Sequence, residues 1–180
     1  LHATYLDVDG RGRVEPEAGE RAITDETYLV PIMHANNEIG TIQPIAAIGR
    51  SGRGRGIACH TDAVQTAGHL ATQLDELDVD LLSLSAHKFY GPKGVGALYI
   101  RKGTKIAPFL HGGEQERRRR ASTHNVPGIV GLGRAIALAE ARREAEGPRL
   151  TALRDRLIAA IVGGIAHTAL NADPRAVAYH

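Results

Sequence analysis

Residues 80–102 read DLLSLSAHKFYGPKGVGALYIRK, and this stretch decides the fold class. Two short apolar runs, 80–85 and 96–102, predict two strands, and the breakers Gly91–Gly94 separate them. Further β-rich runs lie upstream, at 27–33 and 56–60. Because strand patterns alternate with helical ones, the sequence predicts an α/β fold, a three-layer sandwich with a mostly parallel sheet and helices on its faces.

The N-terminal half gives local signals around these strands. Residues 3–8 (ATYLDV) are strand-like, and Pro31 within the run 27–33 suits an edge strand or a strand end. Pro44 fits the first turn of a helix that continues to about Arg53.

The C-terminal part changes character. Residues 114–120 are polar and charged, which predicts a loop. From Pro127 onward apolar residues recur at helical spacing, and Gly147-Pro148 predicts a break before a second helix over 149–169. We therefore expect two parts. Residues 1–135 would belong to a large domain, and residues 136–180 would form a linking helix and the start of a small C-terminal domain.

Composition narrows the function classes. The chain has 180 residues, 43% of them hydrophobic, and a net charge of +2, which is too small to predict nucleic-acid or membrane binding. No apolar run approaches the roughly 20 residues of a membrane helix, and no secretory signal is visible. Cys59 is the single cysteine, which excludes an internal disulfide and favours a cytoplasmic location. Because it falls inside a predicted strand, it is expected to be a buried structural residue.

Four polar clusters follow predicted strands, where open α/β sheets bind ligands. They are residues 33–38, 60–65, 83–88 and 111–113. Taken singly, each cluster is weak evidence for a binding site, because most lysines after strands are solvated and most aspartates in turns are helix caps. The histidines do not show a metal-binding spacing, so no metal is expected.

Lys88 is the centre of the chemistry. An amine beside the Ser85 hydroxyl and the His87 imidazole suits a phosphorylated aldehyde, because the amine can form a Schiff base while the neighbours bind phosphate oxygens. Pyridoxal 5'-phosphate (PLP) also needs an acid at its ring nitrogen. Asp62 ends the preceding strand and can supply it, and Gln65 would lie on the same side if that turn is helical.

Several motifs together resemble the cysteine desulfurase family of the class V aminotransferase superfamily. They are 34–45 (HANNEIGTIQPI), 60–65 (HTDAVQ), 85–94 (SAHKFYGPKG) and the loop from Glu116 to Val130 with its Ala121-Ser122-Thr123. The resemblance runs from about residue 4 to residue 170. Both ends look cut from something longer, since family chains are roughly twice as long.

The resemblance implies roles for particular residues. Lys88 would be the catalytic residue that bonds the cofactor and moves protons, with Asp62 at the ring nitrogen and Gln65 at the phenolic oxygen. Ser85 and His87 would hold the phosphate. Two further residues would act from loops: Thr123 would reach the phosphate bound in the other subunit of a homodimer, and Asn37 would orient the substrate carboxylate.

The resemblance also implies an activity and partners. The family converts L-cysteine to L-alanine and passes the sulfur on as an enzyme persulfide to sulfur-acceptor proteins, for example in iron–sulfur cluster assembly. The family's nucleophilic cysteine loop would lie beyond this segment, so the segment alone is expected to be inactive. Selenocysteine lyase, another class V aminotransferase and a non-catalytic truncated remnant remain open alternatives. Ser122 stands where glycine is usual, which would strain the loop if φ is positive there.

Overall fold

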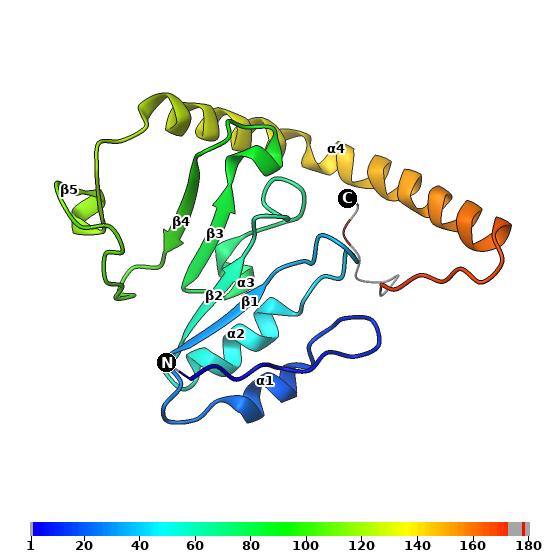
Figure 1. Cartoon of the computed structure of the whole chain (residues 1–180), viewed down its shortest axis with the longest axis horizontal. Coiled ribbons are helices and arrows are strands. Elements are labelled where there is room, and N and C mark those ends of the chain that lie inside the picture. Colours follow the sequence, from blue (N-terminus) through cyan, green and yellow to red (C-terminus); the bar gives the residue numbers. More distant parts are fainter. Residues whose placement is uncertain (1, 173–177, 179–180) are drawn as a thin grey trace.

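A four-stranded sheet forms the centre of the protein (Figure 1). The computed structural model describes residues 2–172 and 178. The strands are β1 (Leu29–Met33), β2 (Ala58–Asp62), β3 (Leu81–Ser85) and β4 (Gly96–Ile100), in the order β1-β2-β3-β4. β1, β2 and β3 are parallel, so the predicted α/β fold with a mostly parallel sheet is confirmed. Pro31 lies in β1 at one edge of this sheet, as its missing N–H suggested.

β4 runs antiparallel to β3, with Ser85 opposite Gly96 and Leu81 opposite Ile100. The connection between the two strands, residues 86–95, explains this direction. A parallel return needs a crossover of roughly a dozen or more residues, whereas an antiparallel return needs only a turn. The C-terminal ends of β1, β2 and β3 lie on one side of the sheet, along the strand direction. The C-terminal end of β4 therefore lies on the other side.

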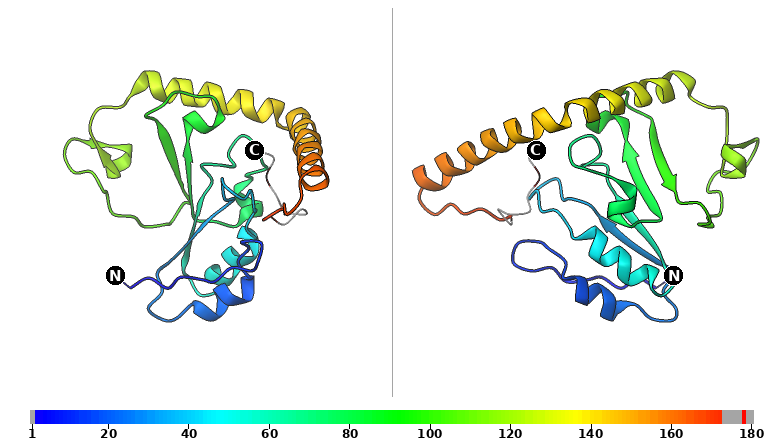
Figure 2. Two further views of the ribbon diagram at one scale, coloured as in Figure 1. Left: turned by 45° about the vertical axis from the view of Figure 1, so that its right-hand side comes forward. Right: turned by 180° about the vertical axis from the view of Figure 1, so that it is seen from behind.

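Two helices form a layer on one face of the sheet, as Figures 1 and 2 show. α2 (Ile45–Arg53) packs on β1 and β2, and α1 (Pro16–Ala22) packs on α2. α2 begins directly after Pro44, as predicted, and contacts the short helix α3 (Leu74–Leu77). The core beneath this layer consists of Ile45, Cys59, Ala63, Leu77, Val79 and Leu82.

α4 (Val126–Gly164) is a single helix of 39 residues, so the predicted break at Gly147-Pro148 is wrong. A proline inside a helix removes one hydrogen bond, and it bends the helix when the turns on both sides are good helix formers. The yellow and orange parts of α4 run in different directions in the left view of Figure 2. α4 crosses the carboxyl end of the sheet, where it contacts the 3₁₀ helix η1 (Ala86–Phe89). The predicted domain boundary at residue 135 falls inside α4 and stays a prediction.

Two other local predictions are wrong. Residues 3–8 are not a strand in the described structure, because their alternating pattern has no neighbouring strand with which to pair. Residues 114–120 are more than a loop. β5 (Glu114–Gln115) and β6 (Arg120–Ala121) pair antiparallel around η2 (Glu116–Arg118), and this hairpin projects away from the sheet (Figure 1). The elements are too short and too charged to give a periodic signal.

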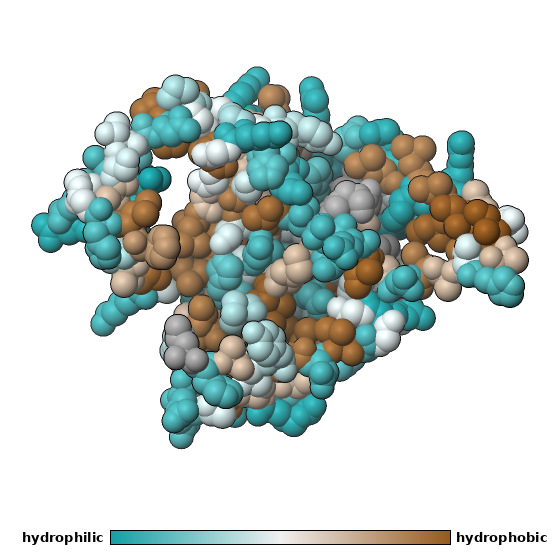
Figure 3. Space-filling model, viewed as in Figure 1, coloured by the Kyte–Doolittle hydropathy of each residue, from teal (hydrophilic) through white to brown (hydrophobic). Residues whose placement is uncertain are grey.

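Apolar side chains also reach the surface. On the face seen in Figure 3 they gather over the sheet and at the far end of α4. The exposed apolar residues of these regions include Leu98, Leu157, Ile161, Val162 and Ile165. Within the described residues, no helix has the length and apolar character to span a membrane.

Candidate functional site at the carboxyl edge of the sheet

The carboxyl ends of β1, β2 and β3 meet at one edge of the sheet. Met33 pairs in register with Asp62, and Asp62 pairs with Ser83. The segments that follow these strands therefore bring three of the four predicted clusters together. The fourth cluster, residues 111–113, is not among them, because it follows the antiparallel β4 and leads into β5.

Asp62 ends β2 and is half-buried. Its Oδ1 accepts a hydrogen bond from the backbone N–H of Val64 at 2.9 Å, which orients the carboxylate at the strand end. Residues 63–70 then form a compact turn, in which the N–H of Ala67 donates to the carbonyl of Ala63 at 2.9 Å. Half-buried Gln65 lies within this helix-like turn, directly after Asp62.

Lys88 lies in η1, the 3₁₀ turn that follows β3. Ser85 Oγ and His87 Nδ1 are 2.9 Å apart and hydrogen-bonded, so the hydroxyl and the imidazole share one side of the turn. Ala86 is 0% exposed and Phe89 is 1% exposed, and both pack in a second core cluster with α4. These two anchors fix η1 while Lys88 stays half-buried and His87 exposed.

Asn36 and Asn37 follow β1, and their side chains differ in environment. Asn36 Oδ1 accepts hydrogen bonds from the backbone N–H groups of Glu38, at 2.8 Å, and Ile39, at 3.1 Å. Asn36 therefore holds its own turn, as asparagine commonly does. Asn37 is exposed on the same turn, so its amide faces solvent at this edge.

Thr123 stands apart from the other predicted site residues. It is exposed in the link between β6 and α4, next to Asn125, whose Oδ1 caps α4 by accepting a hydrogen bond from Gly128 N–H at 3.1 Å. Among the described residues, no hydrogen bond joins Thr123 to Ser85, His87 or Lys88. Its predicted role in a second subunit stays a prediction.

Ser122 has a φ of 77°, in the left-handed region that glycine adopts without strain. We expect Ser122→Gly to raise the free energy of unfolding by about 0.5–1 kcal/mol, because relief of this strain exceeds the entropy that glycine adds to the unfolded chain. Urea denaturation measures the change. Ser122→Ala is the control, since alanine keeps the strain and should give no gain. A gain of equal size in both variants would contradict the explanation.

Two histidines near the strand ends stay neutral at neutral pH. His34 is 5% exposed, its Nδ1 lies 2.9 Å from Thr66 Oγ1, and burial lowers its pKa to about 4. His60 bonds Ser83 Oγ through Nε2 at 2.7 Å. Burial lowers the pKa of His60, while the carboxylate of Asp62 acts in the opposite direction. These two imidazoles therefore act as hydrogen-bonding groups.

Cys59 is 1% exposed in β2, as expected for a structural cysteine. Burial first, and then the carboxylates of Asp80 and Asp78, raise the pKa of its thiol to about 11. The thiolate is the nucleophilic form of cysteine, so Cys59 is a poor sulfur acceptor. The described residues also contain no group of three or more His, Cys, Asp or Glu side chains that could hold a metal ion.

Two further residues that no sequence pattern marked lie at this edge in the fold. Thr66 is 0% exposed and bonds His34, and His69 Nε2 lies 2.8 Å from the carbonyl oxygen of Lys88. A single histidine or threonine in a turn forms no sequence motif that would predict a functional role. The only available signal was their position within eight residues after Asp62, in the same turn as Gln65.

Comparison with known proteins connects this chain to a family. Residues 1–169 match the family described as aminotransferase class-V. The chain is 56% identical over 168 residues to the cysteine desulfurase IscS of Dictyoglomus turgidum. That match covers 93% of this chain and 43% of the relative, so the chain spans less than half the length of the relative.

Solved structures of longer proteins are also similar to this chain. A NifS-like protein superposes with a TM-score of 0.91 at 43% identity, over 98% of this chain and 48% of the other. A structure described as SspA in complex with cysteine superposes with a TM-score of 0.72 at 45% identity, over 74% of this chain and 39% of the other. The fold is therefore shared with larger proteins.

Proposed function

Because this chain belongs to the aminotransferase class-V family, whose members depend on PLP, we propose that it is the cofactor-binding part of a cysteine desulfurase. The observation that carries the proposal is the meeting of Asp62, Gln65 and the Ser85–Lys88 turn at one edge of the sheet. The substrate would be L-cysteine, consistent with the cysteine complex of the similar SspA. The products would be L-alanine and a persulfide, formed as the substrate C–S bond breaks and the sulfur passes to a nucleophilic cysteine thiol other than the buried Cys59.

The donor groups at the edge fit PLP. An amine can bond an aldehyde, a carboxylate can pair with a protonated ring nitrogen, and a hydroxyl with an imidazole can bind phosphate oxygens. Two hydrogen bonds support this fit: the Val64 N–H donates to the Asp62 carboxylate, and Ser85 Oγ bonds His87 Nδ1 at the start of η1. When bound, PLP would supply an electron sink for the substrate carbanion.

The residues of the chain would divide the remaining work. Lys88 would hold the cofactor through Nζ and afterwards carry protons on that atom. Asp62 would keep the ring nitrogen protonated, Gln65 would donate to the phenolic oxygen, and Ser85 with His87 would bind the phosphate. The exposed amide of Asn37 would orient the carboxylate of the substrate.

Several finer features belong to the same proposal. Thr123 would bind the phosphate of a second copy in a homodimer, and its exposed position beside the projecting hairpin supports that role. Sulfur-acceptor proteins, for example in iron–sulfur cluster assembly, would take the sulfur in the cytoplasm. Residues 1–135 would belong to the large domain and 136–180 would lead to the small one. Because its single cysteine is buried with a raised pKa, the chain alone should not desulfurate cysteine.

The direct test is the visible absorption of the purified chain mixed with PLP. The wild type should show a protein-bound band that survives dialysis, and Lys88→Ala should lose it. Lys93→Ala is the matched control, because Lys93 is an exposed lysine on the same connection and should leave the band unchanged.

Borohydride reduction followed by peptide mapping should place the cofactor on Lys88. Identical spectra for the wild type and Lys88→Ala, or a label spread equally over Lys88 and Lys93, would contradict the proposal. A segment that has lost cofactor binding would give that result, which would favour a non-catalytic remnant.

A further inference from the structure

His69 contacts the residue at the centre of the proposed site. Its Nε2 lies 2.8 Å from the backbone carbonyl oxygen of Lys88. Because a carbonyl only accepts hydrogen bonds, His69 must carry a proton on Nε2 and donate it. The His69 ring also meets the ring of Tyr90 edge-on, with centroids 6.2 Å apart. The contact therefore adds a polar hold on the end of η1 beside the packing of Ala67 against Ala86 and Phe89.

The turn that carries His69 connects all three strand ends. It begins directly after Asp62 and contains Gln65, and Thr66 bonds His34 at the end of β1. Gly68 permits the close approach to η1, because a Cβ there would lie 2.9 Å from Ala139 Cβ and 3.1 Å from Phe89 Cβ. A shift of this turn would therefore change the position of Lys88 relative to Asp62.

We propose that His69 is a positioning residue that sets the distance between Lys88 and Asp62 by donating a hydrogen bond from Nε2 to the Lys88 carbonyl. This inference rests on the proposed function, since it assigns His69 a role toward the same cofactor. His69 does not touch the reacting atoms in this assignment. It acts through η1, whose residues Ala86 and Phe89 are already fixed in the core.

The experiment compares His69→Ala with His69→Gln in the full chain, using two readouts. The first is the dissociation constant of PLP, followed by the Lys88-dependent absorption band. The second needs no cofactor: it is the amide hydrogen exchange of Tyr90 and Gly91, which donate to the carbonyl of Ala86 in η1. A glutamine amide can place a donor near the position of the histidine Nε2, so it serves as the conservative variant.

We expect His69→Ala to weaken PLP binding about tenfold and to speed exchange at Tyr90 and Gly91, because one partly buried hydrogen bond is lost. His69→Gln should restore both to within about threefold. His2→Ala, at an exposed histidine, should change neither. Failure of glutamine to rescue a stably folded chain, or an unchanged PLP affinity in His69→Ala, would overturn the proposal.

The two proposals fail in different ways. A wild-type chain without a Lys88-dependent band would contradict the proposed function and the cofactor role of His69 with it. The exchange experiment on the cofactor-free chain would still support or overturn the hydrogen bond as the element that holds η1. A normal band with unchanged exchange in His69→Ala would overturn the positioning role alone.

Discussion

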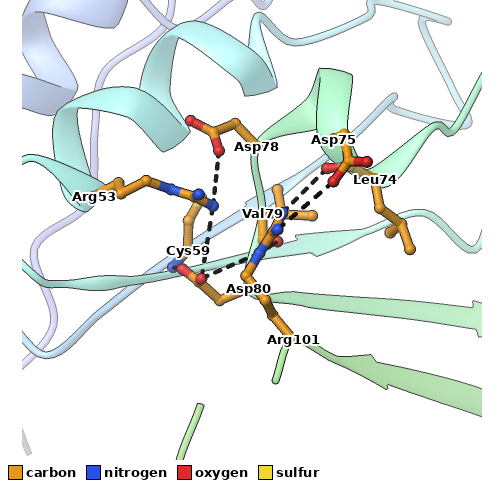
Figure 4. A network of polar contacts seen from close by, with 8 residues as sticks. All are labelled: Arg53, Cys59, Leu74, Asp75, Asp78, Val79, Asp80 and Arg101. Atoms are coloured by element: carbon orange, nitrogen blue, oxygen red, sulfur yellow. Dashed lines mark hydrogen bonds and ion pairs between the residues drawn. The ribbon is translucent and has the colours of Figure 1, made fainter. Parts of the chain in front are cut away.

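Replacing Asp80 with alanine is expected to lower the free energy of unfolding by about 3 kcal/mol in urea denaturation at pH 7. Asp80 precedes β3, and its side chain is 18% exposed. Its Oδ2 accepts a hydrogen bond from the backbone N–H of Cys59 at 2.9 Å. Its Oδ1 lies 3.6 Å from Nε of Arg101 and 3.8 Å from Nη2 of Arg53 (Figure 4).

The expected loss is large because removal of the Asp80 carboxylate leaves a backbone N–H without its acceptor and two arginines without the charge between them. The Cys59 N–H would lose its acceptor in the sheet interior. The two arginines could not easily turn away, because Arg53 bonds Asp78 at 2.7 Å and Arg101 donates to the carbonyl of Val79 at 3.0 Å. Two cations would then lie close together in a half-buried site without the charge between them.

Two further variants divide the effect into its parts. Asp80→Asn keeps an acceptor oxygen for Cys59 but removes the charge, and should cost about 1–2 kcal/mol. Asp75→Ala is the matched control, because Asp75 is 99% exposed and 3.7 Å from Arg101, and it should give no measurable change. A loss below about 0.5 kcal/mol in Asp80→Ala would show that the network contributes little.

The position of this network separates stability from the proposed chemistry. Asp80 directly precedes β3, whereas Ser85 ends β3 and η1 follows it. The network therefore fixes the register of β2 and β3 from the edge opposite the proposed site. We infer that Asp80 variants should keep the PLP band per folded molecule, in contrast to variants of Lys88.

The sequence predicted those features that depend on local pattern. The strands around residues 80–102, the helix after Pro44 and the edge position of Pro31 all follow from composition, breakers and the missing proline N–H. The antiparallel direction of β4 was not among these predictions, although the short connection 86–95 explains it.

Other features depend on tertiary packing, which no local pattern carries. α4 continues through Pro148 despite the expected break, and the paired elements at 114–121 are too short for periodicity. His69 is a single residue whose contact with Lys88 depends on the close packing of its turn against η1 at Gly68. The sequence therefore predicted the residues at the strand ends better than the contacts that hold them.

The second large effect is a loss of stability in mild acid caused by His34. Burial lowers its pKa from 6.5 to about 4 in the folded chain. Above pH 6.5 the residue is neutral in both states and contributes no pH dependence. Between pH 6.5 and 4 the unfolded chain binds a proton that the folded chain does not, so stability falls as the pH falls. Below pH 4 both states are protonated and the contribution becomes constant.

The total contribution of His34 over this window should be about 3 kcal/mol, because each pH unit is worth about 1.4 kcal/mol. Protonation of carboxylates also lowers the free energy of unfolding in acid. The measurement is therefore the difference in pH dependence between the wild type and a His34 variant. Urea denaturation from pH 7 to pH 4 should show a shallower fall for His34→Asn than for the wild type. Asparagine places a donor near the position of Nδ1 and can still bond Thr66, but it does not titrate.

Thr66→Val separates burial from hydrogen bonding as the cause. This variant removes the hydroxyl that lies 2.9 Å from His34 Nδ1 but keeps the side chain enclosed. If burial lowers the pKa, Thr66→Val should retain the steep loss between pH 6.5 and 4. An NMR titration of His34 with a midpoint near 6.5 in the folded wild type would contradict the prediction. It would also mean that the turn carrying Thr66 and His69 opens to water more readily than its packing indicates.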